Sequence, residues 1–598
     1  MAGKTKLELT WIGKDERPRL EPRILIEKPE FSYHAETRRE GDHFDNMLIH
    51  GDNLLALKAL ETDPSVRGKV KCVYIDPPFN TQQAFPNYDD GIEHSLWLSL
   101  MRERLTILRD LLSQDGTMFI HIDDNELAYL TVISDEIFGR ANRVSIVTFK
   151  QGSATGHKSI NPGVVSTSNF ILVYARDKKL WKPNRVFAER SSGRDVRYNQ
   201  FIINRNEPYQ GWRFISLMKA FAEHLGLPEK GLKKALGEEF EEKITEFVHE
   251  NAECVTRPAR PDYKAVSEEA RQMIDLSKID PSQVHRLVRD SGFSDMYFKS
   301  GERILFYKDK LKLIDGGWVS GEPLTSIWDD ILSNNLHNEG GVDFPKGKKP
   351  EALIKRCIEL ATGTGDLVLD SFGGSGTTAA VAHKMKRRWV VVELGDHAKT
   401  HIVPRMRAVI DGADKGGVTE AVIWQGGGGY RFFELAPSLL EKDKWGNLVI
   451  NKCYNPEMLA EAMCKHFNYA YAPSTEHYWM HGKATESAFI YVTTNSLTFD
   501  QLKTLSDEVG EERSLLVCCM AYEAAGDNLT NLTIKKIPRV VLDRCEWGKD
   551  DYSLRIAALP LQDEEPEEHE EADAKQNKSK KIKASVAQTS LFDGSEEN

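Results

Sequence analysis

Short apolar runs alternate with amphipathic segments along two stretches of the chain, residues 46–178 and 321–425. Runs such as "VKCVYI" (70–75) and "DLVLD" (366–370) are apolar at nearly every position, as expected of strands covered on both faces of a parallel sheet. Between the runs, apolar residues recur at helical spacing, as they do over residues 96–112. This alternation predicts an α/β fold with a doubly wound, mostly parallel sheet.

The alternation stops at about residue 179, and up to residue 320 the chain is irregular, polar and rich in Arg, aromatic residues and Pro. A second strand–helix–strand pattern follows over residues 488–522, where Thr498 is a predicted N-cap with Gln501 three residues later. We therefore expect six parts: an N-terminal segment (1–45), the two halves of one sheet domain (46–178 and 321–425), an insert between them (179–320), a smaller C-terminal α/β domain (426–560) and a charged, disordered tail (561–598).

Composition fits a globular protein: of 598 residues, 40% are apolar and 28% are charged. The formal net charge is −12, but residues 563–573 alone carry eight acids, and without them the charge is −4. Net charge therefore does not decide whether the partner is a nucleic acid. The first residues lack the apolar core of a secretory signal, no apolar run could span a membrane, and eight scattered cysteines form no C-x-x-C pair. We expect a reduced, cytoplasmic protein without a metal site.

The strand "VKCVYI" ends abruptly on Asp76-Pro77-Pro78-Phe79. One interpretation is a simple turn, because Asp-Pro opens turns and Pro cannot continue a sheet ladder. The other is a site, because a carboxylate at the carboxyl edge of a buried strand is well placed to meet a ligand. The tetrapeptide alone leaves both open.

A glycine-rich turn joins the strand "DLVLD" to the next helix, and residues 374–379 fit the pattern G-x-G-x-x-A. Such a turn lets a ligand approach the backbone at a helix N-terminus. Glu393 ends the following strand, where an acid can bind ribose hydroxyls. No Lys-Ser/Thr pair follows, so a P-loop is disfavoured. A ligand-free turn and sites for NAD, FAD or S-adenosylmethionine remain open from this motif.

The order of these elements resembles that of β-class amino DNA methyltransferases: "DPPF" at 76–79, then an irregular insert, then "FGGSG" at 372–376. The flanking segments "IHGDNLLAL", "GTMFIHIDDNE" and "FPKGKKPEALIKRCIELATGTGDLVLD" extend the resemblance over residues 46–178 and 321–410. The chain length, the large insert and the C-terminal extension are similar to the modification subunits of type III restriction-modification systems. Phe79 stands where that family most often has Tyr, which keeps a stacking face and removes a phenolic hydroxyl.

The resemblance implies transfer of a methyl group from S-adenosylmethionine to an exocyclic amine of a base flipped out of duplex DNA. It implies that Asp76 and the Pro77 carbonyl accept the amine hydrogens, that Pro78 stiffens the turn and that Phe79 stacks on the base. Asp as first residue favours adenine N6 over cytosine N4. The implied cofactor residues are Asp370, Phe372, Gly373, Gly374, Gly376, Thr377 and Glu393, with Asp52 and Lys349 as further candidates. Capping of the next helix is an equally good role for Asp52.

The start of the insert, residues 181–214, holds seven Lys or Arg against three acids, with aromatic residues between them. Arg side chains contact phosphates and guanine edges, and aromatic rings can fill the gap left by a flipped base. The predicted DNA-binding residues are Arg185, Arg190, Arg194, Arg197, Arg213 and Trp212. The alternative is a solvated basic segment with a small core of its own.

The expected partners are double-stranded DNA, a helicase-nuclease restriction subunit and a second copy of the chain. Alternatives are a solitary adenine or cytosine methyltransferase without a nuclease, a DNA-binding subunit that has lost turnover, and a nicotinamide- or flavin-dependent oxidoreductase. The last leaves "DPPF" and the basic insert unexplained. Methylation of the cytosine ring would need a nucleophilic Cys, and the sequence has no Pro-Cys pair.

Overall fold

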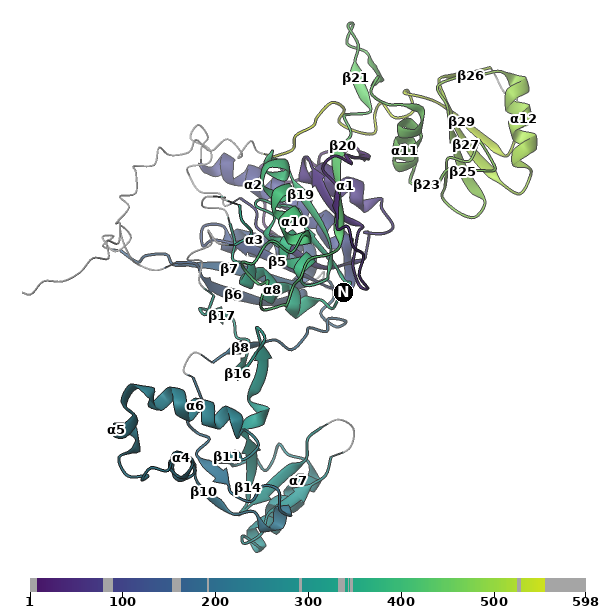
Figure 1. Cartoon of the computed structure of the whole chain (residues 1–598). Coiled ribbons are helices and arrows are strands. Elements are labelled where there is room, and N and C mark those ends of the chain that lie inside the picture. The colour runs from purple at the N-terminus through teal and green to yellow at the C-terminus, as the bar shows by residue number, and fades with distance from the viewer. Residues whose placement is uncertain are drawn as a thin grey trace, which may run out of the picture. The chain divides into compact units, whose positions relative to one another are not determined.

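The structure is a computed structural model of the whole chain, and its elements are shown in Figure 1. It describes residues 8–78, 90–152, 163–190, 193–289, 293–331, 339–342, 344, 348–523 and 529–553. Over these residues, no helix is long and apolar enough to cross a membrane. All eight cysteines are free thiols.

The largest sheet has the strand order β1-β20-β3-β19-β18-β4-β5-β7-β6-β17, with β2 pairing on β20 (Figure 1). Six neighbouring strands, β20 to β5 in that order, run parallel, and β7 is antiparallel to both β5 and β6. The strands are β1 (Leu25–Glu27), β2 (Tyr33–His34), β3 (Asn46–His50), β4 (Val70–Ile75), β5 (Leu112–Ile122), β6 (Arg143–Lys150), β7 (Ser168–Ala175), β17 (Ile327–Trp328), β18 (Leu367–Asp370), β19 (Arg388–Glu393) and β20 (Gly429–Leu435).

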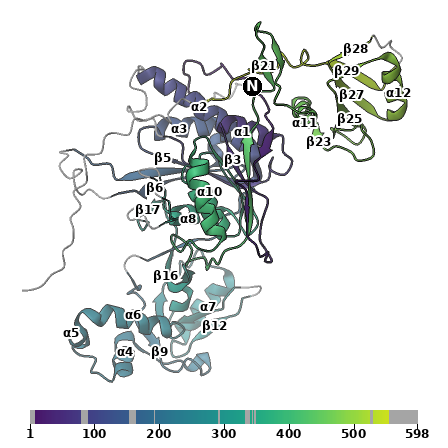
Figure 2. The same cartoon turned by 45° about the horizontal axis from the view of Figure 1, so that its top comes forward.

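Helices cover both faces of this sheet, which explains why its central strands are apolar throughout. One buried cluster joins the sheet to α1 (Asn53–Glu61), α2 (Asp90–Leu111) and α3 (Leu127–Ser134). The other joins it to α8 (Glu351–Ala361), α9 (Thr377–Lys384) and α10 (Val403–Ile410), two of which are labelled in front of the sheet in Figure 2. The predicted doubly wound α/β fold is confirmed.

The sheet also takes in strands that the periodicity assigned elsewhere. β20 follows the run "QGGGGYRF" and pairs with β3 in parallel, while β1 and β2 pair with β20 from the N-terminal segment. Residues 25–34 and 429–435 therefore belong to the main sheet and not to the flanking parts. Just before β20, Gly426, Gly427 and Gly428 have positive φ, which lets the chain turn into the sheet.

The insert folds around a six-stranded sheet of short antiparallel strands with the order β10-β9-β11-β14-β13-β12. Its strands are β9 (Gln200–Ile202), β10 (Phe214–Ser216), β11 (Val255–Ala259), β12 (His285–Leu287), β13 (Met296–Lys299) and β14 (Glu302–Phe306). Its helices are α4 (Leu217–Leu225), α5 (Leu232–Leu236), α6 (Phe240–Glu250) and α7 (Glu268–Ile279). A separate three-stranded sheet joins β8 (Phe187–Glu189), β15 (Leu311–Ile314) and β16 (Gly317–Pro323). Strands of three to five residues give too little alternation to be recognised in a sequence.

The C-terminal part contains a hairpin and a five-stranded sheet with the order β23-β24-β25-β27-β29. Its strands are β21 (Leu440–Lys442), β22 (Leu448–Ile450), β23 (Ala470–Tyr471), β24 (Gly482–Lys483), β25 (Ala488–Val492), β26 (Ser496–Leu497), β27 (Ser514–Cys519), β28 (Ala521–Tyr522) and β29 (Leu532–Lys536), and its helices are α11 (Pro456–Phe467) and α12 (Phe499–Val509). Thr498 and Gln501 form a reciprocal capping box at α12, so the predicted helix start is confirmed.

Candidate active site

Asp76 directly follows β4 in the centre of the main sheet, and its nearest charged partner comes from far along the chain. Asp76 Oδ2 lies 3.0 Å from Lys349 Nζ, with side-chain exposures of 20% and 13%. Oδ1 is buried and has no hydrogen-bond partner among the described residues. Burial raises the pKa of Asp76, and the Lys349 charge and hydrogen bond lower it. The site thus holds a carboxylate with unused acceptor capacity beside a buried ammonium group.

A buried imidazole from β5 stands behind Asp76. His121 Nδ1 lies 3.8 Å from Asp76 Oδ1 and 3.0 Å from the Tyr74 hydroxyl. On the other side of the ring, Asn169 Nδ2 lies 3.1 Å from Nε2. Burial lowers the pKa of His121 well below its usual value, so the ring is neutral at neutral pH. These polar groups form a fixed wall that limits how the Asp76 carboxylate can turn.

The two prolines after Asp76 differ in what their carbonyl oxygens bind. Trp97, a buried residue of α2, donates its indole N–H to the Pro78 carbonyl at 2.9 Å. This bond restrains the turn and uses one acceptor position of the Pro78 carbonyl, which keeps Pro77 as the preferred candidate within the dipeptide. Phe79 lies outside the described residues.

The glycine-rich turn connects β18 to α9 at the same edge of the sheet as Asp76. A Cβ on Gly373 would lie 2.6 Å from Val391 Cγ1, and a Cβ on Gly376 would lie 2.9 Å from Ile402 Cγ2. Gly376 also has φ +77°, whereas a Cβ on Gly374, at φ +50°, would lie 4.0 Å from the Phe372 carbonyl oxygen. The turn therefore requires glycine for close packing behind Gly373 and Gly376 and is less crowded at Gly374.

Two acids at strand ends shape this turn. Asp370 accepts hydrogen bonds from Phe372 N at 2.8 Å and from the Thr378 hydroxyl at 2.6 Å, and burial raises its pKa to about 7. Glu393 accepts from Gly374 N at 2.6 Å through one oxygen and from Gly395 N at 2.8 Å through the other. Each carboxylate oxygen has a second acceptor position, so Glu393 can still bind a ligand hydroxyl.

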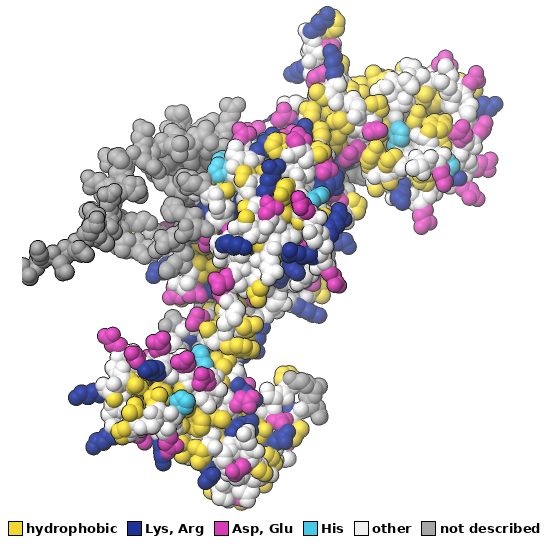
Figure 3. All heavy atoms as spheres, viewed as in Figure 1, with side chains coloured by type: hydrophobic (Ala, Val, Ile, Leu, Met, Phe, Trp, Pro, Cys, Tyr) yellow, Lys and Arg dark blue, Asp and Glu magenta, His cyan; other side chains and the backbone are white. Residues whose placement is uncertain are grey.

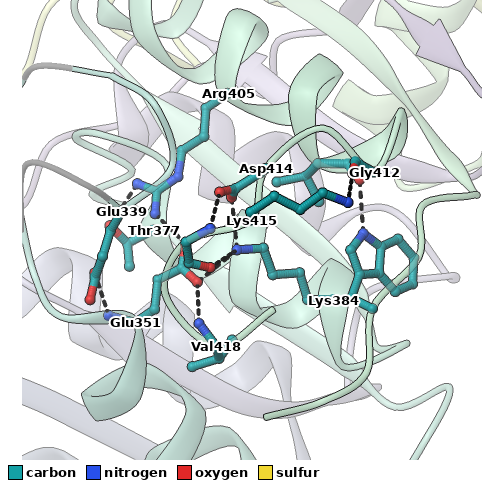
Figure 4. Close-up of polar contacts among 12 residues, drawn as sticks. Glu339, Glu351, Thr377, Lys384, Arg405, Gly412, Asp414, Lys415 and Val418 are labelled. Atoms are coloured by element: carbon teal, nitrogen blue, oxygen red, sulfur yellow. Dashed lines mark hydrogen bonds and ion pairs between the residues drawn. The ribbon is translucent and has the colours of Figure 1, made fainter. Parts of the chain in front are cut away.

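A network of buried charges anchors the glycine-rich turn (Figure 4). Arg405 donates to the Ser375 carbonyl at 3.2 Å and to Thr377 Oγ1 at 3.0 Å, and it pairs with Glu351 at 2.7 Å. Glu351 also pairs with Lys384 at 2.8 Å, and all three charged side chains have 0% exposure. The Thr377 hydroxyl is therefore engaged in anchoring the turn.

Asp52 is the N-cap of α1 and accepts from the backbone N–H of Leu54 and Leu55. It also accepts from Tyr552 N at 2.9 Å and lies 3.6 Å from Arg104. The side chain is fully buried, and both of its oxygens accept backbone hydrogen bonds. The capping role that the sequence left open is the one in the structure, and a cofactor contact remains a proposal.

The predicted DNA-binding residues are divided between surface and core. Trp212 is 3% exposed and packs against Tyr297 and Phe306 in a small core of the insert. Three of the arginines pair with acids: Arg190 with Glu322, Arg194 with Glu241 and Arg197 with Asp195. Arg185 lies over the Phe187 ring.

Arg213 is exposed and lines a groove of about 550 Å³ on the insert sheet, together with Gln200, Gln210, Phe214 and Lys299. Figure 3 shows side chains of both charges over the insert, so its surface is mixed and not uniformly basic. Gln and Arg are the side chains that read adenine and guanine edges. This groove is the part of the insert best equipped to contact bases.

Comparison with known proteins assigns the family. The N6/N4 methyltransferase family model, described as DNA methylase, matches residues 70–404. That range covers more than half of the chain and contains both the Asp-Pro-Pro turn and the glycine-rich turn. The chain therefore belongs to the DNA methylase family.

Two curated relatives are modification subunits. The "Probable type III restriction-modification enzyme HindVI Mod subunit" of Haemophilus influenzae is 32% identical over 73% of this chain and 60% of its own length. The type III EcoPI Mod subunit of Escherichia phage P1 is 29% identical over 64% of this chain and 61% of its own length. The chain thus spans about three-fifths of these relatives. The solved PvuII DNA methyltransferase, cytosine-N4-specific, is 12% identical, covers 65% of this chain and 94% of its own, and has a TM-score of 0.30.

Three contributors to the site were absent from the sequence prediction: His121, Trp97 and Arg405. Trp97 belongs to the apolar periodicity of a helix, His121 lies within a strand pattern, and Arg405 is an ordinary charge in a helical segment. The only signal was a polar ring, His121, within an otherwise apolar strand that ends on two acids.

Proposed function

We propose that this protein transfers a methyl group from S-adenosylmethionine to the N6 amine of adenine in double-stranded DNA. The observation that carries this proposal is the unused acceptor capacity of Asp76 in the rigid Asp-Pro-Pro turn, beside the glycine-rich turn. An exocyclic amine is a weak nucleophile because its lone pair is delocalised into the ring. Acceptors placed at its hydrogens favour a more pyramidal, more nucleophilic nitrogen.

The chain supplies these acceptors in a preorganised form. Asp76 offers a carboxylate oxygen, and the family resemblance assigns the second acceptor to the Pro77 carbonyl, while the Pro78 carbonyl already accepts one bond from Trp97. The prolines fix φ, so the acceptors need little rearrangement when the base arrives. Such a pocket is reached only by a base that has left the duplex, and Phe79 is proposed to stack on it.

The residues around the glycine-rich turn suit a cationic nucleoside cofactor. The surroundings of Gly374 are less crowded than those of Gly373 and Gly376, Glu393 retains acceptor positions for ribose hydroxyls, and Asp370 shapes the turn between them. We assign Phe372, Gly373, Gly376 and Thr377 to the walls and anchor of this pocket. When bound, S-adenosylmethionine supplies an activated methyl sulfonium, so the remaining work of the protein is positioning.

We further propose that the chain is the modification subunit of a type III restriction-modification system, reads DNA through the insert and forms a homodimer. The names of the two relatives and the large folded insert support this. Adenine is favoured over cytosine because Asp76 begins the Asp-Pro-Pro element.

The test is transfer of a labelled methyl group from S-adenosylmethionine to methylation-free bacterial DNA. Wild type is expected to label DNA, and Asp76→Asn is expected to lose transfer while still binding the cofactor. Co-purification with a helicase-nuclease subunit would support the type III assignment, and robust transfer by a chain that never binds such a subunit would favour a solitary enzyme. Absence of labelling despite cofactor binding would contradict the proposal.

A further inference from the structure

We propose that Lys349 is a positioning residue for methyl transfer, which holds the Asp76 carboxylate ionised and in a fixed orientation for the target amine. The inference rests on the proposed function and adds to it a residue that acts through Asp76. Lys349 Nζ lies 3.0 Å from Asp76 Oδ2, although the two residues are far apart in the sequence.

The contacts around Asp76 leave Lys349 as its main restraint. Oδ1 has no hydrogen-bond partner among the described residues, and His121 Nδ1, at 3.8 Å, is too distant for one. Among the described residues, the contact from Lys349 to Oδ2 is therefore the polar contact that restrains the carboxylate. A carboxylate with one fixed oxygen presents its remaining lone pairs in a defined direction.

The position of Lys349 is itself fixed by buried charges. Pro350 follows it as the N-cap of α8, and the next residue, Glu351, is fully buried and paired with Arg405 and Lys384 (Figure 4). The Glu351 N–H also donates to Glu339 Oε2 at 3.0 Å. Because Arg405 grips the glycine-rich turn as well, one network ties the amino end of α8 to that turn. The chain segment that carries Lys349 and the glycine-rich turn are thus anchored by the same network of buried charges.

The charges facing Asp76 explain why an ammonium is needed there. Among the described residues, the other titratable groups near Asp76 are His121 from β5, which is neutral, Tyr74 from β4, which burial keeps protonated, and Asp370 from β18, which supplies no positive charge. Burial alone raises the pKa of Asp76, and Lys349 is the group that lowers it. A protonated Asp76 would lose an acceptor for the amine, so loss of the Lys349 charge moves the acid limb of the reaction to higher pH.

The alternative is that Lys349 binds the cofactor directly. The two roles differ in what they change: a cofactor ligand alters the affinity for S-adenosylmethionine, whereas a positioning residue alters the rate and its pH dependence at saturating cofactor.

The experiment compares Lys349→Gln, Lys349→Arg and Lys355→Gln with wild type. Lys355 lies on α8, six residues after Lys349, and its partly buried side chain pairs with the exposed acids Asp315 and Glu359, which makes it a matched control for loss of one charge. The measurements are the labelled-methyl transfer rate against pH at saturating S-adenosylmethionine, and calorimetric binding of S-adenosylmethionine alone.

We expect Lys349→Gln to lower the rate at neutral pH on the order of 10²-fold, to raise the pH of the acid limb and to leave cofactor affinity unchanged. Lys349→Arg, which keeps the charge, should keep the acid limb in place, and Lys355→Gln should match wild type. An unchanged rate and acid limb in Lys349→Gln would overturn the inference, as would weaker cofactor binding that accounts for the whole loss. If wild type itself transfers no methyl group, the proposed function fails and this inference fails with it.

Discussion

Asp76 and Asp370 are carboxylates at the ends of neighbouring strands, yet their surroundings differ. Asp76 is partly exposed, with a lysine partner and spare acceptor capacity, whereas Asp370 is buried, accepts two hydrogen bonds and has no cationic partner among the described residues. Environment therefore separates a carboxylate suited to bind an amine from one suited to shape a turn.

The raised pKa of Asp370 makes a prediction about stability and pH. Its folded pKa is about 7, above the value of about 4 in an unfolded chain, so the native state binds more protons between these pH values. The contribution of Asp370 to the free energy of unfolding is therefore highest at low pH and is lost as pH rises towards 7. We expect the free energy of unfolding of Asp370→Asn, measured in urea, to rise relative to that of wild type by on the order of a few kcal/mol from pH 5 to pH 8. A difference between the two proteins that does not change with pH would contradict this.

At the scale of elements, strand ends and helix starts meet where β18 and β4 lie side by side. The helix after β18 packs on one face of the sheet and the helix after β4 on the other, so the chain order reverses between these two strands. The buried charge network joins the glycine-rich turn to the amino end of α8 at this place.

Gly376→Ala tests the packing behind the turn. The new Cβ would meet Ile402 at 2.9 Å in a backbone conformation with φ +77°. Gly226 is the matched control, because it has φ +66° at the end of α4 and nothing within 4 Å of its Cβ position. We expect Gly376→Ala to cost about 1–3 kcal/mol more than Gly226→Ala in urea unfolding and to weaken binding of S-adenosylmethionine. Equal costs would mean that backbone strain alone matters there.

Glu351→Gln tests the network itself. Removal of one partner leaves buried charge without compensation, so the free energy of unfolding should fall by about 3–5 kcal/mol. Glu359→Gln, on the same helix, breaks only a partly exposed i,i+4 pair with Lys355 and should cost about 0.5 kcal/mol. Similar losses in the two variants would show that the buried network adds no special stability.

The sequence predicted those features that depend on local pattern. The doubly wound sheet follows from apolar runs, and the two turns at its edge follow from Asp76-Pro77-Pro78 and the glycines. The pairing of Asp76 with Lys349, the wall made by His121 and the entry of β20 into the sheet depend on contacts between distant residues, which periodicity does not encode. Trp212 shows the opposite limit, because an aromatic residue in a basic segment fits a DNA contact and a small core equally well until the fold is known.

At the scale of the whole molecule, the chain combines a methylase sheet domain, a folded insert and a C-terminal α/β part. We expect the groove lined by Arg213 to be the part of the insert that contacts DNA. Arg213→Ala should weaken DNA binding and leave cofactor affinity unchanged. The slope of the logarithm of the DNA-binding constant against the logarithm of the salt concentration should fall in magnitude by about one. Arg271→Ala on α7, which removes an arginine paired with Glu268, is the control and should leave DNA binding near wild type. Identical DNA affinity and salt slope in Arg213→Ala and wild type would exclude this groove from the DNA interface.

The most direct test of the central claim is single-molecule sequencing of DNA from cells that express wild type or Asp76→Asn. The account predicts N6-methyladenine at one sequence motif in wild-type cells and none in the variant, with both proteins binding S-adenosylmethionine equally well. Methylation that persists in Asp76→Asn, or a modified base other than an amino-methylated one in wild-type cells, would contradict it.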